Sequence, residues 1–405
     1  MTGDERPPSN PANGTAREVF LAFLRLGCLS FGGPIAHLGY FRSEFVERRQ
    51  WCTEETYAEI VALAQSVPGP ASSQVGFTLG LLRASWAGGL AAWVGFTTPS
   101  ALLMLAFAFS HPFLGGKLGL AVIHGLQLVA VAVVAQAVLA MQKSLAPDLS
   151  RMGLAVLAAA IVLFASPTSG TVLAIVVGGL LGWLLLRSDI TPGSPAPPVR
   201  ISKGQGLIAA GLALTLLLLL PILSGIAGSR TLNVFNAFYR TGALVFGGGH
   251  VVLPLLENAV VARGWVDQQT FLSGYGAAQA IPGPLFTFAA YLGAEVTPTP
   301  NRLAFAALAL TAIFLPGLLI MTAVLPFWSE LRSKRQIQAS LRGVNASVVG
   351  VLLAAFYRPV WTSAVQTRVD FLIAIVAFAL LVWWKLPPWV MVLTVAAMSC
   401  AAALF

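Results

Sequence analysis

Two arginines, Arg25 and Arg240, each lie in a stretch that is otherwise apolar enough to enter a membrane, and they stand 215 positions apart. A charge inside a bilayer is costly unless it is paired, hydrated or able to snorkel to the interface. A guanidinium is always protonated and presents a planar fork of donors that suits oxyanions. One such arginine could be an interfacial anchor, but two at matched positions predict a pair that binds a small anion.

Consecutive glycines follow each arginine at the same spacing, as Gly32 and Gly33 in the first half and Gly247 and Gly248 in the second. Adjacent glycines loosen a helix and permit unusual backbone angles, and Pro34 removes a further amide donor from the first copy. The alternative is close helix packing through small residues, which is common in membranes. We expect instead an interrupted helix at each Phe-Gly-Gly motif, with all four glycines at a substrate site.

A Pro-Gly-Pro sequence, preceded by a glutamine, interrupts an apolar segment in each half, and the second copy lies 214 positions after the first. Non-helical backbone at membrane depth is tolerated only inside protein or against a water-filled cavity. The helix that resumes after each break presents unpaired N–H groups and a positive dipole end, which favour an anion. A simple kink is the alternative, but it would not require the glutamine twice. The residues we expect to bind substrate here are Gln65, Pro68, Gly69, Ser72, Ser73, Gln279, Pro282, Gly283 and Thr287.

Few titratable residues lie in or beside the interrupted segments. His37, Glu59 and His250 do, and because a histidine titrates near neutral pH we take these three as candidates for proton coupling. Each could equally be structural, as a hydrogen-bond donor or as an interfacial carboxylate. The duplication does not extend to His250, because Ile35 stands at the matching position.

Motifs of other chemistry are missing from the sequence. It contains no G-x-x-x-x-G-K-[ST], G-x-S-x-G or H-E-x-x-H motif, and its three cysteines form no C-x-x-C pair. We therefore expect no ATP hydrolysis through a P-loop, no enzyme activity, no metal and no cofactor. A duplicated block in so apolar a chain is typical of transporters built from two repeats, and the energy for transport would then come from the membrane potential or an ion gradient.

The elements that must position these residues are membrane helices. Of the 405 residues, 57% are hydrophobic and 10% charged, whereas soluble chains carry about 25% charged residues. Apolar windows of about 20 residues, the length of a membrane span, recur along the chain. The net charge of +9 would suggest nucleic acid in a soluble protein, but the Lys and Arg mostly flank apolar runs, as membrane topology requires. We predict an all-α polytopic membrane protein that contacts the lipid bilayer and no nucleic acid.

The apolar segments are arranged as six, then one, then six. We divide the chain into a disordered N-terminal tail (1–16), a first repeat (17–187), a linker with an extra transmembrane helix (188–231) and a second repeat (232–405). The expected segments are 17–39, 57–82, 85–110, 118–141, 152–166 and 170–187, then 206–224, then 232–257, 270–294, 302–327, 338–357, 369–384 and 388–404.

The single extra helix fixes how the repeats relate. Because it reverses the direction of the chain, we expect the repeats to be inverted, related by a two-fold axis in the membrane plane. Loops on the side of the N-terminus carry more Lys and Arg than those on the other side, which predicts a cytoplasmic N-terminus.

Four stretches of the first half, at 31–37 (FGGPIAH), 41–46 (FRSEFV), 49–51 (RQW) and 65–74 (QSVPGPASSQ), together resemble the chromate ion transporter family. The second half resembles that family's second repeat at 246–254 (FGGGHVVLP) and 279–284 (QAIPGP), so the chain is similar to a long, two-domain member. Residues 65–67 depart from the bulkier Gln-Phe-Leu of the family motif, and we expect this to alter local packing alone.

The resemblance implies secondary active transport of chromate, a tetrahedral dianion, out of the bacterial cytoplasm across the inner membrane, which confers chromate resistance. It implies that the arginine, Gly-Gly and Pro-Gly-Pro motifs act together, and it leaves potential-driven export, proton antiport and a homodimer open. Two other functions remain: an exchanger or passive pathway for sulfate or another oxyanion, and a membrane-embedded enzyme acting on a phosphate group. The enzyme would need a base beside the arginines, and the second repeat duplicates neither Glu59 nor His37.

Overall fold

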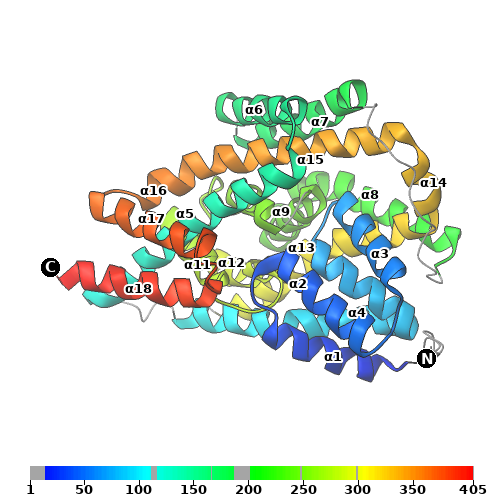
Figure 1. Cartoon of the computed structure of the whole chain (residues 1–405), viewed down its shortest axis with the longest axis horizontal. Helices are drawn as coiled ribbons and strands as arrows, with labels where there is room; N and C mark the ends of the chain where they lie inside the picture. The colour runs from blue at the N-terminus through cyan, green and yellow to red at the C-terminus, as the bar shows by residue number, and fades with distance from the viewer. Residues whose placement is uncertain are drawn as a thin grey trace, which may run out of the picture.

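The computed structural model describes residues 14–110, 116–165, 167–186, 201–246, 249–297 and 300–404 (Figure 1). Within these ranges every regular element is a helix, which confirms the all-helical class predicted from composition. Five helices of this described part are long and apolar enough to cross a membrane, and shorter apolar helices accompany them; the five are Ala71–Ser110, Gly116–Leu145, Lys203–Ala227, Arg302–Leu331 and Arg335–Ala364.

The helices follow the expected segments in order. The first half contains α1 (Ala16–Leu29), α2 (Gly33–Arg42), the π-helix η1 (Ser43–Arg48), α3 (Glu54–Ser66), α4 (Ala71–Ser110), α5 (Gly116–Leu145), α6 (Leu149–Phe164) and α7 (Pro167–Leu185). The extra helix is α8 (Lys203–Ala227). The second half contains α9 (Arg230–Leu244), η4 (Gly249–Val251), α10 (Val252–Val260), α11 (Gln268–Ala278), η5 (Leu285–Thr287), α12 (Phe288–Val296), α13 (Arg302–Val324), η6 (Leu325–Phe327), α14 (Trp328–Ser333), α15 (Arg335–Ala355), η7 (Phe356–Trp361), α16 (Thr362–Ala364), α17 (Arg368–Val382) and α18 (Pro388–Leu404).

The predicted interruptions are present where the structure describes them. The first falls between α1 and α2, where Gly32 and Gly33 have φ angles of 99° and 77°. The Pro-Gly-Pro breaks separate α3 from α4 and α11 from η5, and their central glycines, Gly69 and Gly283, have φ angles of 129° and 92°. Positive φ is a conformation that glycine adopts at little cost, which accounts for its use at each break.

Glycines at matching positions let the first helix of each repeat approach the proline-bearing helix of the same repeat. A Cβ on Gly27 of α1 would lie 2.7 Å from the carbonyl oxygen of Phe96 in α4. A Cβ on Gly242 of α9 would overlap the carbonyl oxygen of Ile313 in α13. The α1–α4 pair and the α9–α13 pair are therefore built alike.

The π-helix η1 explains why the spacing between the copies falls from 215 to 214. The Trp51 N–H donates to the carbonyl of Phe45, six residues earlier, at 2.7 Å. The matching Trp265 N–H donates to the carbonyl of Val260, only five residues earlier, at 2.9 Å. The first repeat thus holds one extra residue between the Phe-Gly-Gly motif and the tryptophan, and a π-helix is the form in which a helix absorbs such an insertion.

The two halves exchange their last helices. The long helix α5 of the first half packs along α17 and α18, whereas α15 of the second half packs along α6 and α7 (Figure 1). Small residues bring these helices together, as where a Cβ on Gly182 of α7 would lie 2.6 Å from the Cα of Gly343 in α15. Likewise, a Cβ on Gly125 of α5 would lie 3.1 Å from the Cα of Ala396 in α18.

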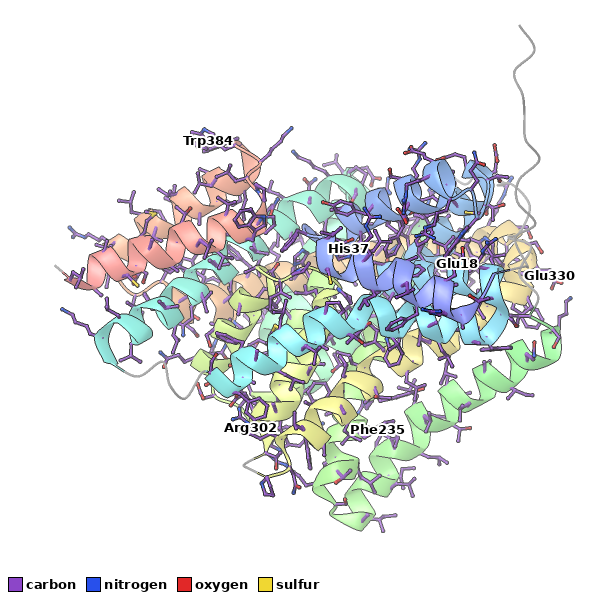
Figure 2. The ribbon with its side chains drawn as sticks, turned by 90° about the horizontal axis from the view of Figure 1, so that it is seen from below. Glu18, His37, Phe235, Arg302, Glu330 and Trp384 are labelled. Carbon is purple, nitrogen blue, oxygen red and sulfur yellow. The ribbon has the colours of Figure 1, made fainter. Side chains whose placement is uncertain are left out.

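His37 of α2 lies inside the molecule, whereas Glu330 and Trp384 lie at opposite ends of it (Figure 2). The imidazole ring of His37 meets the ring of Phe96 edge-on, with the centroids 5.3 Å apart, and Phe41 packs on the same phenylalanine. The first interrupted helix therefore ends in a cluster of aromatic rings formed with α4.

Candidate functional site

The two kinds of break are joined by a reciprocal pair of backbone hydrogen bonds. The N–H of Gly283, in the second Pro-Gly-Pro, donates to the carbonyl of Ser30 at 2.9 Å, just before the first Gly-Gly. The N–H of Gly69, in the first Pro-Gly-Pro, donates to the carbonyl of Val245 at 2.8 Å. Ser30 and Val245 hold matching places in the two copies, so each repeat gives the other the same bond. Reciprocity of this kind is the pattern that a two-fold relation produces.

Pro34 and Gly249, which also hold matching places, meet each other directly. A Cβ on Gly249 would lie 3.1 Å from Cγ of Pro34. Contact between equivalent residues is what a two-fold relation between the copies would produce. The residues that flank the Gly-Gly motifs, namely Ser30, Pro34, Val245 and Gly249, therefore converge with the Pro-Gly-Pro motifs on one region, which we call the crossover.

Both Pro-Gly-Pro loops lie tightly against the proline-bearing helix of the opposite repeat. A Cβ on Gly69 would lie 2.8 Å from the Cα of Gly317 in α13. A Cβ on Gly283 would lie 2.8 Å from Oγ of Ser100 in α4. Ser100 follows the proline of α4 as Gly317 follows that of α13, so the two contacts are again equivalent, and glycine is required at both.

Polar side chains without partners gather around the crossover. His37 Nε2 donates to the carbonyl of Ser30 at 3.1 Å, so in the neutral ring the lone pair is on Nδ1. That Nδ1, Oγ of Ser30 and Oγ1 of Thr97 are buried and have no hydrogen-bond partner among the residues that the structure describes. Leaving such an atom unsatisfied costs about 1–3 kcal/mol, which favours occupation by water or a polar ligand.

Buried polar atoms without partners also occur at the start of α4, on the other side of the crossover. The Gln74 side chain donates through Nε2 to the carbonyls of Pro68 and Gly317, at 2.9 and 3.0 Å. Its Oε1 and the neighbouring Oγ of Ser73 are buried without a partner in the described part of the chain. Buried Ser72 lies in the same first turn, where the helix also presents free N–H groups. This end of α4 can therefore donate to an anion from its backbone and bind water or a hydroxyl through its side chains.

Other predicted binding residues lie in varied surroundings. The second half presents buried Pro282 and buried Thr287, whose Oγ1 donates to the carbonyl of Pro284 at 2.8 Å. Gln279 is half-buried and donates weakly to its own helix at 3.4 Å, whereas Gln65 is exposed at the end of α3. Gly247 and Gly248 lie outside the described residues.

Neither arginine side chain makes a hydrogen bond or ion pair with these groups among the residues that the structure describes. Arg25 is exposed on the face of α1 that carries Leu21 and Leu29, opposite the face packed on α4. Arg240 is half-buried on α9. Neither makes an ion pair with a residue that the structure describes, so their joint binding of an anion stays a prediction.

The other two residues named for proton coupling each have a partner. His250 Nδ1 lies 2.9 Å from the hydroxyl of buried Tyr275. Glu59 accepts from the indole of Trp328 at 3.3 Å, between α3 and α14. Both partners fit the structural alternative weighed for these residues, whereas His37 retains an unpartnered nitrogen.

The sequence did not point to Ser30, Thr97 or Ser100. Ser100 could have been found, because it follows Pro99, which has a counterpart in Pro316. Ser30 contributes its carbonyl, which no side-chain pattern reveals.

Comparisons with known proteins agree with the duplication. The family model for the chromate transporter matches residues 17–183 and again 232–400. The chromate transport protein of Cupriavidus metallidurans is 30% identical over 399 residues, covering 94% of this chain and 93% of that protein. The chromate transport protein of Pseudomonas aeruginosa is 29% identical, covering 83% of this chain and 79% of that protein. No solved structure matches the chain.

Proposed function

Because the chain belongs to the chromate transporter family, we propose that it is a secondary active transporter that carries chromate out of the cytoplasm across the bacterial inner membrane and so confers resistance. Relatives that carry the name chromate transport protein match over most of their length, which supports chromate as the substrate. We also propose that the N-terminus is cytoplasmic.

The observation that carries the proposal is the crossover. Two interrupted segments from each repeat exchange backbone hydrogen bonds there. Buried hydroxyl, amide and imidazole groups around it lack partners in the described residues. No carboxylate is among these groups, and the free N–H groups of α4 point to an anion rather than a cation. A tetrahedral dianion offers acceptors in four directions, which suits donors that converge from both repeats.

The reciprocal contacts also support a mechanism. In transporters with inverted repeats, one repeat rocks against the other around a fixed site, and access alternates between the two sides. We propose that the repeats of this chain are inverted and that the crossover is their pivot, with Pro34 and Gly249 at its axis. Breaking the Gly69–Val245 bond or the Gly283–Ser30 bond alone would open one side while the other stays closed.

Coupling to protons is proposed through His37 in the first place. Its Nε2 is fixed on the carbonyl of Ser30, and its Nδ1 is free to take a proton or to face the anion. His250 and Glu59 are further candidates. In a proton antiport, chromate efflux would rise with an inward proton gradient and would be lost in His37→Gln.

The proposal is tested with purified protein in proteoliposomes. Chromate flux is measured with and without an imposed potential and a pH gradient, with sulfate as competitor. Flux that the pH gradient drives, or flux that saturates with chromate and responds to the potential, supports secondary active export. Non-saturating flux that only follows the electrochemical gradient of the anion would replace it by a passive pathway. Exchange that requires an anion on both sides would replace it by an exchanger.

The same assay tests the arginines. We expect Arg25→Gln and Arg240→Gln each to lower chromate flux at least tenfold, since each removes a forked donor. Arg17→Gln is the control, because Arg17 is exposed on α1 as Arg25 is. Near-normal flux in a well-folded Arg25→Gln protein would remove that arginine from the site.

A further inference from the structure

In each half of the chain, two guanidiniums lie over the ring of one tryptophan. The tryptophan stands in the turn before the helix that ends at the Pro-Gly-Pro motif. In the first repeat, Arg49 and Arg83 lie 5.6 and 5.4 Å from the ring centroid of Trp51. In the second, Arg263 and Arg230 lie 5.0 and 4.6 Å from that of Trp265. Arg49 and Arg263 are matched in sequence, and the residue after each has a positive φ. We call the two arrangements the first and the second arginine–tryptophan cluster.

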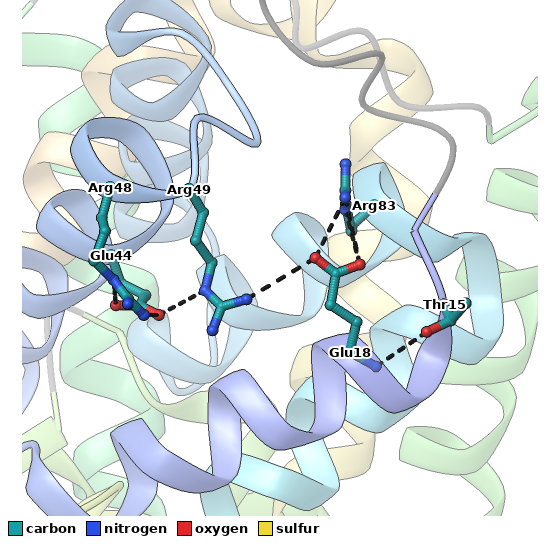
Figure 3. A network of polar contacts seen from close by, with 6 residues as sticks. All are labelled: Thr15, Glu18, Glu44, Arg48, Arg49 and Arg83. Carbon is teal, nitrogen blue, oxygen red and sulfur yellow. Dashed lines mark hydrogen bonds and ion pairs between the residues drawn. The ribbon is translucent and has the colours of Figure 1, made fainter.

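The first cluster is neutralised by carboxylates (Figure 3). Arg83 donates through Nη2 to Glu18 at 3.2 Å, and Arg49 forms an ion pair with the same carboxylate at 3.9 Å. Arg49 also donates through Nε to Glu44 at 2.6 Å, and Arg48 pairs with Glu44 as well. Burial opposes ionisation of Glu44, but the two arginines hold its pKa below the ordinary value. Two carboxylates thus pair with three guanidiniums, so every arginine of this group has an acidic partner.

The second cluster lacks both carboxylates. The position that matches Glu18 is Asn233, and the position that matches Glu44 is Ala259, as the two tryptophan hydrogen bonds align the copies. Arg230 donates only to the carbonyl of Val296, at 2.9 Å, and neither it nor Arg263 pairs with an acid in the described part of the chain. Asp267, two residues after the tryptophan, caps α11 instead.

The charge of the second cluster therefore has no acidic partner in the described part of the chain. Partial burial lowers the pKa of Arg263, and the nearby charge of Arg240 lowers it further. Two like charges held on one ring, without an acidic partner among the described residues, favour the binding of an anion.

We propose that Arg230 and Arg263 form an oxyanion capture site at the second cluster, and that its absence from the first cluster makes the two ends of the transport pathway electrostatically unequal. The ligand is a tetrahedral oxyanion, supplied either by the solution as the transported dianion or by the lipid as a headgroup phosphate. This inference rests on the proposed function, because it assigns the site a place on the route to the crossover.

The expected effect is on substrate capture from one side of the membrane. An electrostatic site raises the encounter rate of a charged substrate by about 10–1,000-fold, and salt weakens it. Neutralising the site should therefore raise KM for chromate on that side by about 3–10-fold or more, leave kcat nearly unchanged, and matter less at high ionic strength.

Asn233→Glu is the sharpest variant, because it transplants the first cluster's carboxylate and leaves every arginine in place. Asn233→Gln is its neutral control, and the reverse exchange Glu18→Asn should create a capture site at the other end. KM for chromate is measured in proteoliposomes sorted by orientation, at low and high salt, and folding is monitored by gel filtration and thermal unfolding.

Lipid composition separates the two sources of the ligand. If the dianion in solution is captured, Asn233→Glu raises KM equally in vesicles of a phosphate-free galactolipid and in vesicles containing phosphatidylglycerol. If headgroup phosphate is held, the variant has no effect in the galactolipid and abolishes the change in KM that phosphatidylglycerol causes in the parent protein. Unchanged KM from both sides in both lipids, with transport intact, would overturn the inference alone, whereas no chromate flux in the parent protein would overturn the proposed function.

Discussion

The residues that join the two repeats act through backbone atoms. The carbonyl of Ser30 accepts from both Gly283 and His37, and that of Val245 accepts from Gly69. Because a carbonyl is available from any residue, a serine and a valine can perform the same task at matching places. The two backbone donors, Gly69 and Gly283, cannot be replaced in this way, because their positive φ angles and close contacts admit only glycine.

Alanine at Gly69 is therefore expected to damage the protein severely. Its φ of 129° is strained for alanine, and its Cβ would meet the backbone of Gly317. We expect a loss of about 1–3 kcal/mol in the free energy of unfolding from strain, with more from the contact, together with loss of flux. Thermal unfolding in detergent and chromate flux measure the two effects.

Gly39→Ala is the control for this substitution. Gly39 lies in helix α2, has no positive φ, and a Cβ there would meet nothing within 4 Å. The control should be neutral or slightly stabilising, because alanine is the better helix former. Equal stability of the two variants would show that the Gly69 turn relaxes freely and does not hold the crossover.

At the level of helices, the sequence predicted much of what is present. The thirteen apolar segments correspond to helices in the same order, and the breaks fall at Gly32 and at both Pro-Gly-Pro motifs, because glycine and proline act on the chain locally. The sequence did not place Gly283 against Ser30, or Gly69 against Gly317. Those contacts join residues far apart in the chain, and no periodicity records which distant carbonyl an amide will meet.

The π-helix η1 gives a test at this level. If it holds one inserted residue, deleting exposed Glu47 should convert it to a regular turn and leave the protein folded. Glu47 pairs with Arg42, but both side chains are about half exposed, at 50% and 48%, so the pair adds little stability. We expect a change below about 1 kcal/mol in unfolding free energy, measured by thermal unfolding.

Deletion of Val61 in α3 is the matched comparison. It removes one residue from a regular helix and rotates everything that follows by one position, so buried Leu63 would turn away from its packing. That protein should be lost from the membrane fraction. If the Glu47 deletion fails in the same way, the interpretation of η1 as an insertion is wrong.

At the level of the whole molecule, the exchange of terminal helices couples the two halves. The α5 helix packs on α17 and α18, and α15 packs on α6 and α7, so neither half completes its own core. The duplication can be recognised in the sequence, but the exchange of helices cannot. An apolar helix face predicts that the face is buried, but not which helix packs against it.

The exchange predicts the behaviour of divided chains. Fragments 1–187 and 188–405 expressed separately should aggregate, whereas co-expression should restore chromate flux, since each supplies the helices that the other lacks. Flux and co-purification of the fragments are the measurements. A fragment that folds alone into a stable, monodisperse species would show that the exchanged contacts are dispensable.

The same arrangement sets an order on biosynthesis. The α5 helix enters the bilayer early, but the partners it packs against are translated last, so the nascent protein must hold an unfinished interface through nearly the whole of its second half. A premature stop codon within α18 would thus first leave α5, in the N-terminal half, without its packing partner.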